Sequence, residues 1–92
     1  MARLGQDEIE DRLSRLQGWS LEGDALVREQ KCDRFIGSVA FVNRVARVAE
    51  EMDHHPDLAI SWDTVTMTIT THSEGALTAG DFELAGRIDA LG

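Results

Sequence analysis

The sequence predicts an α+β fold, in which a four-stranded antiparallel sheet carries helices packed on one face. Three segments space their apolar residues as helices do, and two further segments have the pattern of β-hairpins, in the order α-β-β-α-β-β-α. A chain of 92 residues has the length of one domain, so residues 1–92 are expected to form a single unit.

The first helix is expected within residues 5–19, GQDEIEDRLSRLQGW. Its apolar residues recur at i, i+4 and i+7, the spacing of one helix face: Ile9, Leu13 and Leu16. Gly18 supplies a C-terminal stop. Residues 19–34 then predict a β-hairpin, with Gly23 and Asp24 as its two-residue turn.

Residues 35–52, FIGSVAFVNRVARVAEEM, predict the clearest helix. The expected apolar stripe is Phe35, Val39, Val42, Ala46 and Ala49, and the opposite face holds Gly37, Arg44, Arg47 and Glu51. The helix should end before Pro56, because a proline pushes the residue before it, His55, towards extended geometry.

Residues 58–72, LAISWDTVTMTITTH, predict two strands joined tightly at Asp63 and Thr64. Apolar residues alternate with small or polar ones, which is typical of strands with one buried face: Leu58, Ile60 and Trp62, then Val65, Met67 and Ile69.

Residues 76–91 predict the last helix. Thr78 is the expected N-cap, and Asp81, three residues on, completes a capping box. Leu77 and Phe82 flank the cap as a hydrophobic staple. The expected apolar face is Phe82, Ala85, Ile88 and Leu91.

Composition excludes several classes of function. The net charge of −8 and the lack of a dense cationic cluster argue against direct nucleic-acid binding. No apolar run approaches the roughly 20 residues of a membrane span, and the N-terminus lacks a secretory h-region, so a cytoplasmic protein without membrane contact is expected. A single cysteine, Cys32, excludes an intramolecular disulfide and is expected to pack as a small strand residue.

Residues suited to proton transfer gather at the junctions of the predicted elements. They are Glu50, His54, His55, His72 and Asp81, with Trp62 between them in the sequence. Histidine is suited to this task because its ordinary pKa of about 6.5 lies near neutrality. No G-x-S-x-G motif, Cys-His neighbours or Gly-rich phosphate loop indicates another chemistry.

Each of these residues also has a structural explanation. His54 and His55 could hydrogen-bond the last carbonyls of a helix, and Asp81 is accounted for by its capping box with Thr78. Trp62 and Trp19 fit a core or a pocket wall, Glu50 a solvated helix face, and His72 an exposed strand end. Three histidines and a carboxylate could also bind zinc, although no H-E-x-x-H spacing is present.

Together these residues resemble the signature of the pterin-4a-carbinolamine dehydratases. The matching elements are Glu50, the run His54-His55-Pro56, Trp62, His72 and Asp81. The similarity also covers the first helix, which ends in Gly18-Trp19, and the helix that begins at Phe35, so it extends over nearly the whole chain. One departure lies in the strand before that helix, where Gln30 and Cys32 stand at positions that are usually aromatic in the family.

The resemblance implies a lyase that removes water from 4a-hydroxytetrahydropterin to give quinonoid dihydropterin, for reuse by a pterin-dependent hydroxylase. It implies no metal and no organic cofactor. His54, His55 and His72 would be catalytic; Glu50 and Asp81 would orient imidazoles, Pro56 would fix where the paired histidines point, and Trp19 and Trp62 would wall the pocket. A homodimer or homotetramer is expected, and the alternative role is that of a non-catalytic dimerisation or assembly cofactor for another protein.

Overall fold

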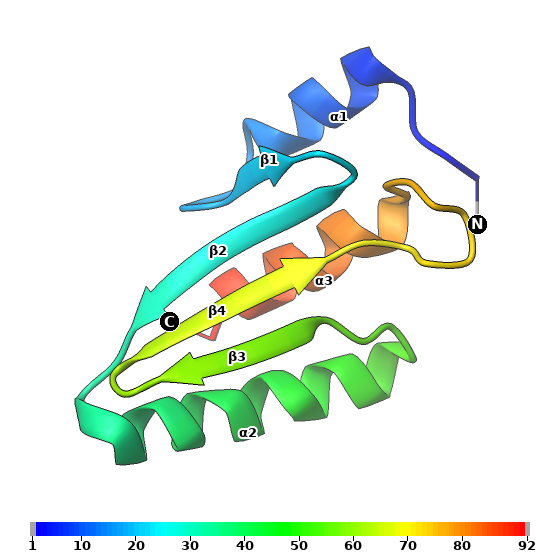
Figure 1. Cartoon of the computed structure of the whole chain (residues 1–92). Coiled ribbons are helices and arrows are strands. Elements are labelled where there is room, and N and C mark those ends of the chain that lie inside the picture. The colour runs from blue at the N-terminus through cyan, green and yellow to red at the C-terminus, as the bar shows by residue number, and fades with distance from the viewer. Residues whose placement is uncertain (1, 92) are drawn as a thin grey trace.

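The structure, a computed structural model that describes residues 2–91, confirms the predicted α+β fold (Figure 1). The elements are α1 (Gln6–Leu13), β1 (Ser20–Glu22), β2 (Ala25–Lys31), α2 (Arg34–Met52), β3 (Asp57–Ser61), β4 (Thr64–Ile69) and α3 (Ala79–Asp89). The four strands form one antiparallel sheet in the order β1-β2-β4-β3. Strands β2 and β4 are therefore central, and β1 and β3 are the edges.

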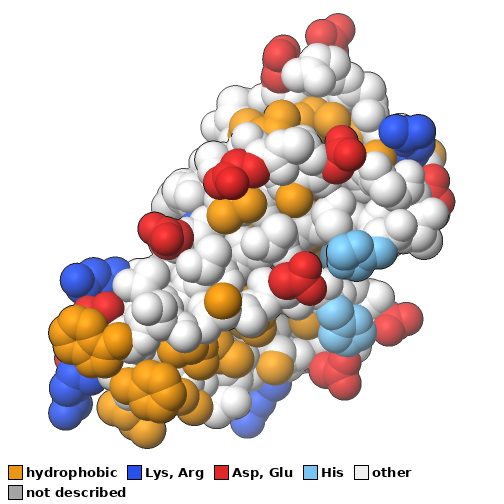
Figure 2. All heavy atoms as spheres, viewed as in Figure 1, with side chains coloured by type: hydrophobic (Ala, Val, Ile, Leu, Met, Phe, Trp, Pro, Cys, Tyr) orange, Lys and Arg blue, Asp and Glu red, His pale blue; other side chains and the backbone are white. Residues whose placement is uncertain are grey.

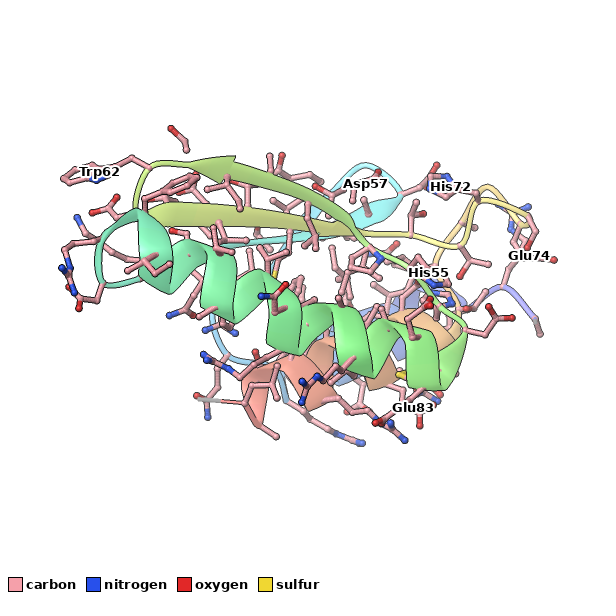
Figure 3. All side chains as sticks on the ribbon, turned by 90° about the horizontal axis from the view of Figure 1, so that it is seen from below. His55, Asp57, Trp62, His72, Glu74 and Glu83 are labelled. Atoms are coloured by element: carbon pink, nitrogen blue, oxygen red, sulfur yellow. The ribbon has the colours of Figure 1, made fainter. Side chains whose placement is uncertain are left out.

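Helices α2 and α3 lie on the same side of the sheet, as the view along it makes plain (Figure 3). Strand β4 shows why the sheet has two unlike faces. Its apolar side chains, Val65, Met67 and Ile69, are fully buried beneath the helices, whereas the alternating threonines are half-buried. The predicted alternation of β4 is thus confirmed, and it places the core between the sheet and the helices.

The buried stripe of α2 differs from the predicted one. The buried residues are Ser38, Phe41, Val45 and Ala49, whereas Phe35 is 54% exposed and Ala46 is also exposed. Only Ala49 belongs to both sets. Apolar residues surround most of this helix, so its spacing fits more than one stripe, and packing against the sheet selects among them. As a result, Phe35 and Ile36 lie outside the core.

The predicted turns and caps are mostly confirmed. Gly23 has a positive φ of 61° in the β1–β2 turn, as a two-residue hairpin requires. The capping box of Thr78 and Asp81 is present at the start of α3. The β3–β4 connection, however, lies one residue earlier than predicted, because Ser61 pairs with Thr64 and the turn consists of Trp62 and Asp63. Trp62 is therefore a turn residue rather than a strand residue.

Helix α1 is shorter than predicted and contributes only the edge of the core. It has no buried residue, although its apolar side chains pack against the core cluster. Among residues 2–91, no helix is both long and apolar enough to cross a membrane.

Candidate functional site

The three histidines lie at one end of the sheet. Helix α2 stops at Asp53, whose left-handed backbone (φ 51°) turns the chain, and His54 and His55 follow before β3 begins. His72 lies in the turn after β4. Figure 3 shows His55 and His72 at the same end of the molecule, and Trp62 at the opposite end. The antiparallel topology thus brings together residues that are up to 18 positions apart.

His54 is held by a buried carboxylate. Its Nε2 lies 2.6 Å from Oδ1 of Asp81, and the side chains are 10% and 0% exposed. The second oxygen of Asp81 accepts hydrogen bonds from the Thr71 hydroxyl and the Thr78 backbone N–H, both at 2.8 Å. Asp81 is therefore both the capping-box partner of Thr78 and a hydrogen-bond partner of His54, so its structural role does not exclude a contact with the histidine.

His55 is held by a second carboxylate, in a more exposed setting. Its Nε2 pairs with Oε2 of Glu50, one turn back on α2, and the side chains are 54% and 75% exposed. An exposed pair of this kind contributes little to stability, but it orients the ring. Both paired histidines thus present Nε2 to a carboxylate.

The His72 side chain is exposed and makes no hydrogen bond or ion pair with the rest of residues 2–91. Pro56 is half-buried between His55 and β3. Figure 2 shows two histidine side chains close together on one face, with acidic side chains around them. The site is therefore open to solvent, with the His55 and His72 side chains exposed on it.

Two depressions of the surface lie away from the histidines. One of about 590 Å³ is lined by residues of β1, β2 and β4, and one of about 190 Å³ lies between α1 and α3. No histidine lines either of them. Within residues 2–91, no three His, Cys, Asp or Glu side chains gather in a way that could hold a metal ion.

The structure does not bring Trp62 to the histidines of the same chain. The five residues of β3 separate Pro56 from Trp62, and six steps along a strand span about 20 Å. Its side chain is 68% exposed, so it is not a core residue either. The prediction that it walls the pocket is not met within one chain.

Trp19 also lies away from the histidines. It is buried, and its indole N–H donates to Oδ1 of Asp89 at 2.8 Å, near the C-terminal end of α3. Asp89 is about 12 Å along the helix from Asp81. Arg28 binds the same Asp89 oxygen at 2.6 Å. Trp19 thus belongs to a polar cluster with Asp89 and with Arg28 of β2.

This placement makes a prediction for Trp19. Replacement by phenylalanine keeps most of the packing and removes the hydrogen bond to Asp89, so the free energy of unfolding should fall by about 1.5–3 kcal/mol. Catalysis by the folded variant should be unchanged. Urea denaturation and rate assays at a fixed concentration of folded protein check this. A lowered dehydration rate with an unchanged free energy of unfolding would show instead that Trp19 contributes to the pocket.

Sequence reasoning missed Thr71. Its hydroxyl is buried, donates to Asp81 and lies 2.8 Å from the Thr78 hydroxyl. The only signal in the sequence was its place next to His72, and the run of threonines on β4 concealed it. Thr71 connects the end of β4 to the carboxylate that holds His54.

Comparison with known proteins points to one family. The sequence profile of the family described as pterin 4 alpha carbinolamine dehydratase matches residues 2–91. A relative from Streptomyces avermitilis, provisionally named pterin-4-alpha-carbinolamine dehydratase, is 48% identical over 89 residues, which cover 96% of this chain and 88% of the relative. Another from Sulfolobus acidocaldarius, named in the same way, is 43% identical and covers 97% and 98%.

Two solved structures share the fold. The crystal structure of a transcriptional coactivator/pterin dehydratase from Brucella melitensis matches with a TM-score of 0.91 at 33% identity, over 98% of each chain. A pterin dehydratase-like RuBisCO assembly factor of the alpha-carboxysome matches with a TM-score of 0.64 at 19% identity, over 83% of this chain and 87% of the other. The second likeness concerns the fold alone. On the match of residues 2–91 and these identities, the chain belongs to the pterin-4a-carbinolamine dehydratase family.

Proposed function

We propose that this protein is a 4a-hydroxytetrahydropterin dehydratase, a lyase that works by histidine general acid–base catalysis. The observation that carries the proposal is the convergence of His54, His55 and His72 at one end of the sheet, where carboxylates hold two of them by Nε2. The family supports the substrate class, a pterin that carries a hydroxyl at C4a.

The carboxylates determine which imidazole nitrogen is basic. A carboxylate only accepts hydrogen bonds, so a neutral His54 or His55 keeps its proton on Nε2 and has a lone pair on Nδ1. His55 is the more exposed of the two, and we assign it the role of the base that takes the proton from N5 of the pterin. His54 would flank the reacting hydroxyl from its buried position.

His72 is the proposed acid, because it is exposed and no carboxylate of the described residues binds it. It would protonate the C4a hydroxyl as the C–O bond breaks. The N5 lone pair then forms the C4a=N5 double bond, and the N5 proton passes to His55. The products are water and quinonoid dihydropterin, which a reductase can recycle. This scheme uses no metal and no organic cofactor.

The remaining residues would position these groups. Asp81 and Glu50 fix the rings of His54 and His55 through their hydrogen bonds, and Pro56 fixes the backbone direction where the paired histidines enter β3. These orienting contacts matter because a general base acts only when its lone pair points at the proton that it accepts.

The proposal is tested by the dehydration rate of freshly generated 4a-hydroxytetrahydropterin, with and without the protein, in the presence of EDTA. We expect an acceleration that EDTA leaves unchanged. Loss of the acceleration on adding EDTA would replace this scheme by a metal-dependent one. A folded protein that gives no acceleration would contradict the dehydratase function.

That last outcome would favour a non-catalytic role in dimerisation or assembly with another protein. The observation that keeps this alternative open is the name of the 33% identical Brucella protein, which couples a transcriptional coactivator with a pterin dehydratase. In that case the next experiment is a search for protein partners with the His55→Ala variant as bait beside the wild type.

We also propose that the protein is a homodimer or homotetramer. Within residues 2–91, no strand pairs with the outer edge of β3. Exposed apolar residues accompany it: Phe35, Ile36, Ile60 and Trp62. Sedimentation at micromolar concentration tests this assembly directly.

A further inference from the structure

The inward row of side chains on β4 is followed by a hydroxyl. The apolar residues of that row are Val65, Met67 and Ile69, and all three are fully buried. Thr71 stands two positions after Ile69, where the alternation of a strand continues the same row, and only 8% of it is exposed. A valine would fill this space without a polar atom to satisfy. The hydroxyl therefore needs a partner, and Oδ2 of Asp81 lies 2.8 Å from it.

The backbone of Thr71 holds the turn that carries His72. Its N–H donates to the Ala76 carbonyl at 3.3 Å, and its carbonyl accepts from the N–H groups of Glu74 and Gly75, both at 3.0 Å. Thr71 and Ala76 thus close the loop between β4 and α3 as an isolated bridge (Figure 1). Removal of the hydroxyl would leave these backbone hydrogen bonds in place, so the hydroxyl serves a separate purpose.

The direction of the hydrogen bonds around Thr71 follows from the groups involved. A carboxylate only accepts, so the single hydroxyl proton of Thr71 is donated to Oδ2 of Asp81. The Thr78 hydroxyl, 2.8 Å away, must then donate to the Thr71 oxygen. The Thr78 oxygen in turn accepts the Asp81 N–H in the capping box. Three buried residues thus form one directed chain of donors, from Thr78 through Thr71 to Asp81.

The other oxygen of the same carboxylate holds His54. Oδ1 of Asp81 lies 2.6 Å from Nε2 of His54. The terminal torsion of an aspartate has a broad energy minimum, so donors from outside must fix the rotation of its carboxylate. The Thr78 N–H supplies one donor to Oδ2, and the Thr71 hydroxyl supplies a second from the end of β4. Because the carboxylate is planar, fixing Oδ2 also fixes Oδ1.

We propose that Thr71 is a positioning residue of the dehydratase site, which fixes the ring orientation and the tautomer of His54 through Asp81. Its hydroxyl holds Oδ2, so that Oδ1 stays directed at Nε2 and the lone pair of His54 stays on Nδ1. The catalytic consequence of this inference rests on the proposed function. The orientation of His54 is a property of the protein without substrate.

The first test is nitrogen-15 NMR of the His54 ring without substrate, at alkaline pH, where imidazoles are neutral. The wild type should show one tautomer, with its proton on Nε2. Thr71→Val keeps the shape of the side chain and removes the hydroxyl. The second tautomer should then become measurable, and the Nε2 proton should exchange with solvent about tenfold faster, as expected for one lost hydrogen bond to a charged group.

Two further variants separate the hydroxyl from the packing. Thr71→Ser keeps the hydroxyl and loses a methyl group, so it should retain the wild-type signals of His54. Thr68→Val makes the matched change in the outward row of the same strand and should also leave these signals unchanged. A folded Thr71→Val protein with the wild-type signals, or an equal change in Thr68→Val, would overturn the proposal.

Dehydration rates test the catalytic consequence. Thr71→Val should slow the reaction about tenfold, the factor that one such hydrogen bond can supply, and Thr71→Ser should restore most of the rate. In a His54→Ala background, Thr71→Val should cause no further loss, because its effect passes through His54. A further tenfold loss in that background would overturn the proposal. A wild-type protein without activity would reject the proposed function, while the NMR signals would still decide whether Thr71 positions His54.

A measurement on the wild-type protein keeps the test decisive if Thr71→Val fails to fold. The hydroxyl protons of Thr71 and Thr78 are donated within a buried chain, so both should exchange slowly and be visible by proton NMR. Hydroxyl protons that exchange as fast as those of exposed threonines would overturn the donor chain, and with it the proposed role of Thr71.

Discussion

Alanine at His55 is expected to slow dehydration about 10²- to 10⁴-fold, because it removes the imidazole assigned to accept the N5 proton. The side chain is 54% exposed and packs little, so the free energy of unfolding should change by less than about 0.5 kcal/mol. Stopped-flow measurement of the rate on pre-formed carbinolamine, beside a urea titration, checks both parts.

Two further variants assign the roles around His55. His72→Ala should slow the reaction by a similar factor if it supplies the proton to the hydroxyl. Glu50→Gln leaves His55 in place and changes only its partner, so its effect should be smaller than that of His55→Ala. Unchanged rates for the alanine variants of all three histidines would contradict the scheme as a whole.

The sequence was sufficient for the fold because local signals and tertiary packing agree along most of the chain. The alternation of Val65, Met67 and Ile69 admits one buried face, and all three are buried. The capping box at Thr78 and the glycine of the β1–β2 turn likewise have one structural solution each. Where a sequence pattern was compatible with only one local structure, the protein adopts that structure.

Helix α2 shows the limit of such reasoning. Its apolar residues cover more than one face, so the stripe that packs on the sheet depends on contacts with elements far away in the sequence. The choice of Ser38 in the core, for instance, follows from its hydrogen bond to the Trp62 carbonyl, 24 residues away. No periodicity in the helix itself encodes that partner.

The candidate site was predictable in composition but only partly in geometry. The motif led to the candidate acid–base residues, and the structure pairs His54 with Asp81 and His55 with Glu50. The two tryptophans were expected at the pocket because they accompany the motif in sequence. Within the chain, however, Trp19 packs against Asp89, and the five residues of β3 hold Trp62 at the end of the strand away from His55.

The buried hydrogen-bond network of Asp81 leads to a prediction of comparable size. Asp81 is fully buried, and its carboxylate binds His54, Thr71 and the Thr78 N–H. Asp81→Ala leaves these groups without their acceptor. The free energy of unfolding should fall by about 3–5 kcal/mol, because three buried hydrogen-bond donors lose their acceptor at roughly 1–3 kcal/mol each. Urea denaturation measures it, and a loss below 1 kcal/mol would contradict the network.

The Asp81→Asn variant distinguishes the effect of Asp81 on the stability of the fold from its effect on the His54 tautomer. The oxygen that serves Thr71 and Thr78 must remain an acceptor, so the amide nitrogen of asparagine would replace the oxygen that faces His54. It would donate to Nε2 and force the His54 proton onto Nδ1, the reverse of the wild-type tautomer. We expect a folded protein whose rate falls about 10²-fold. Nitrogen-15 shifts of the His54 ring report the tautomer; an unchanged tautomer with a lowered rate would show that Asp81 acts otherwise than by orienting His54.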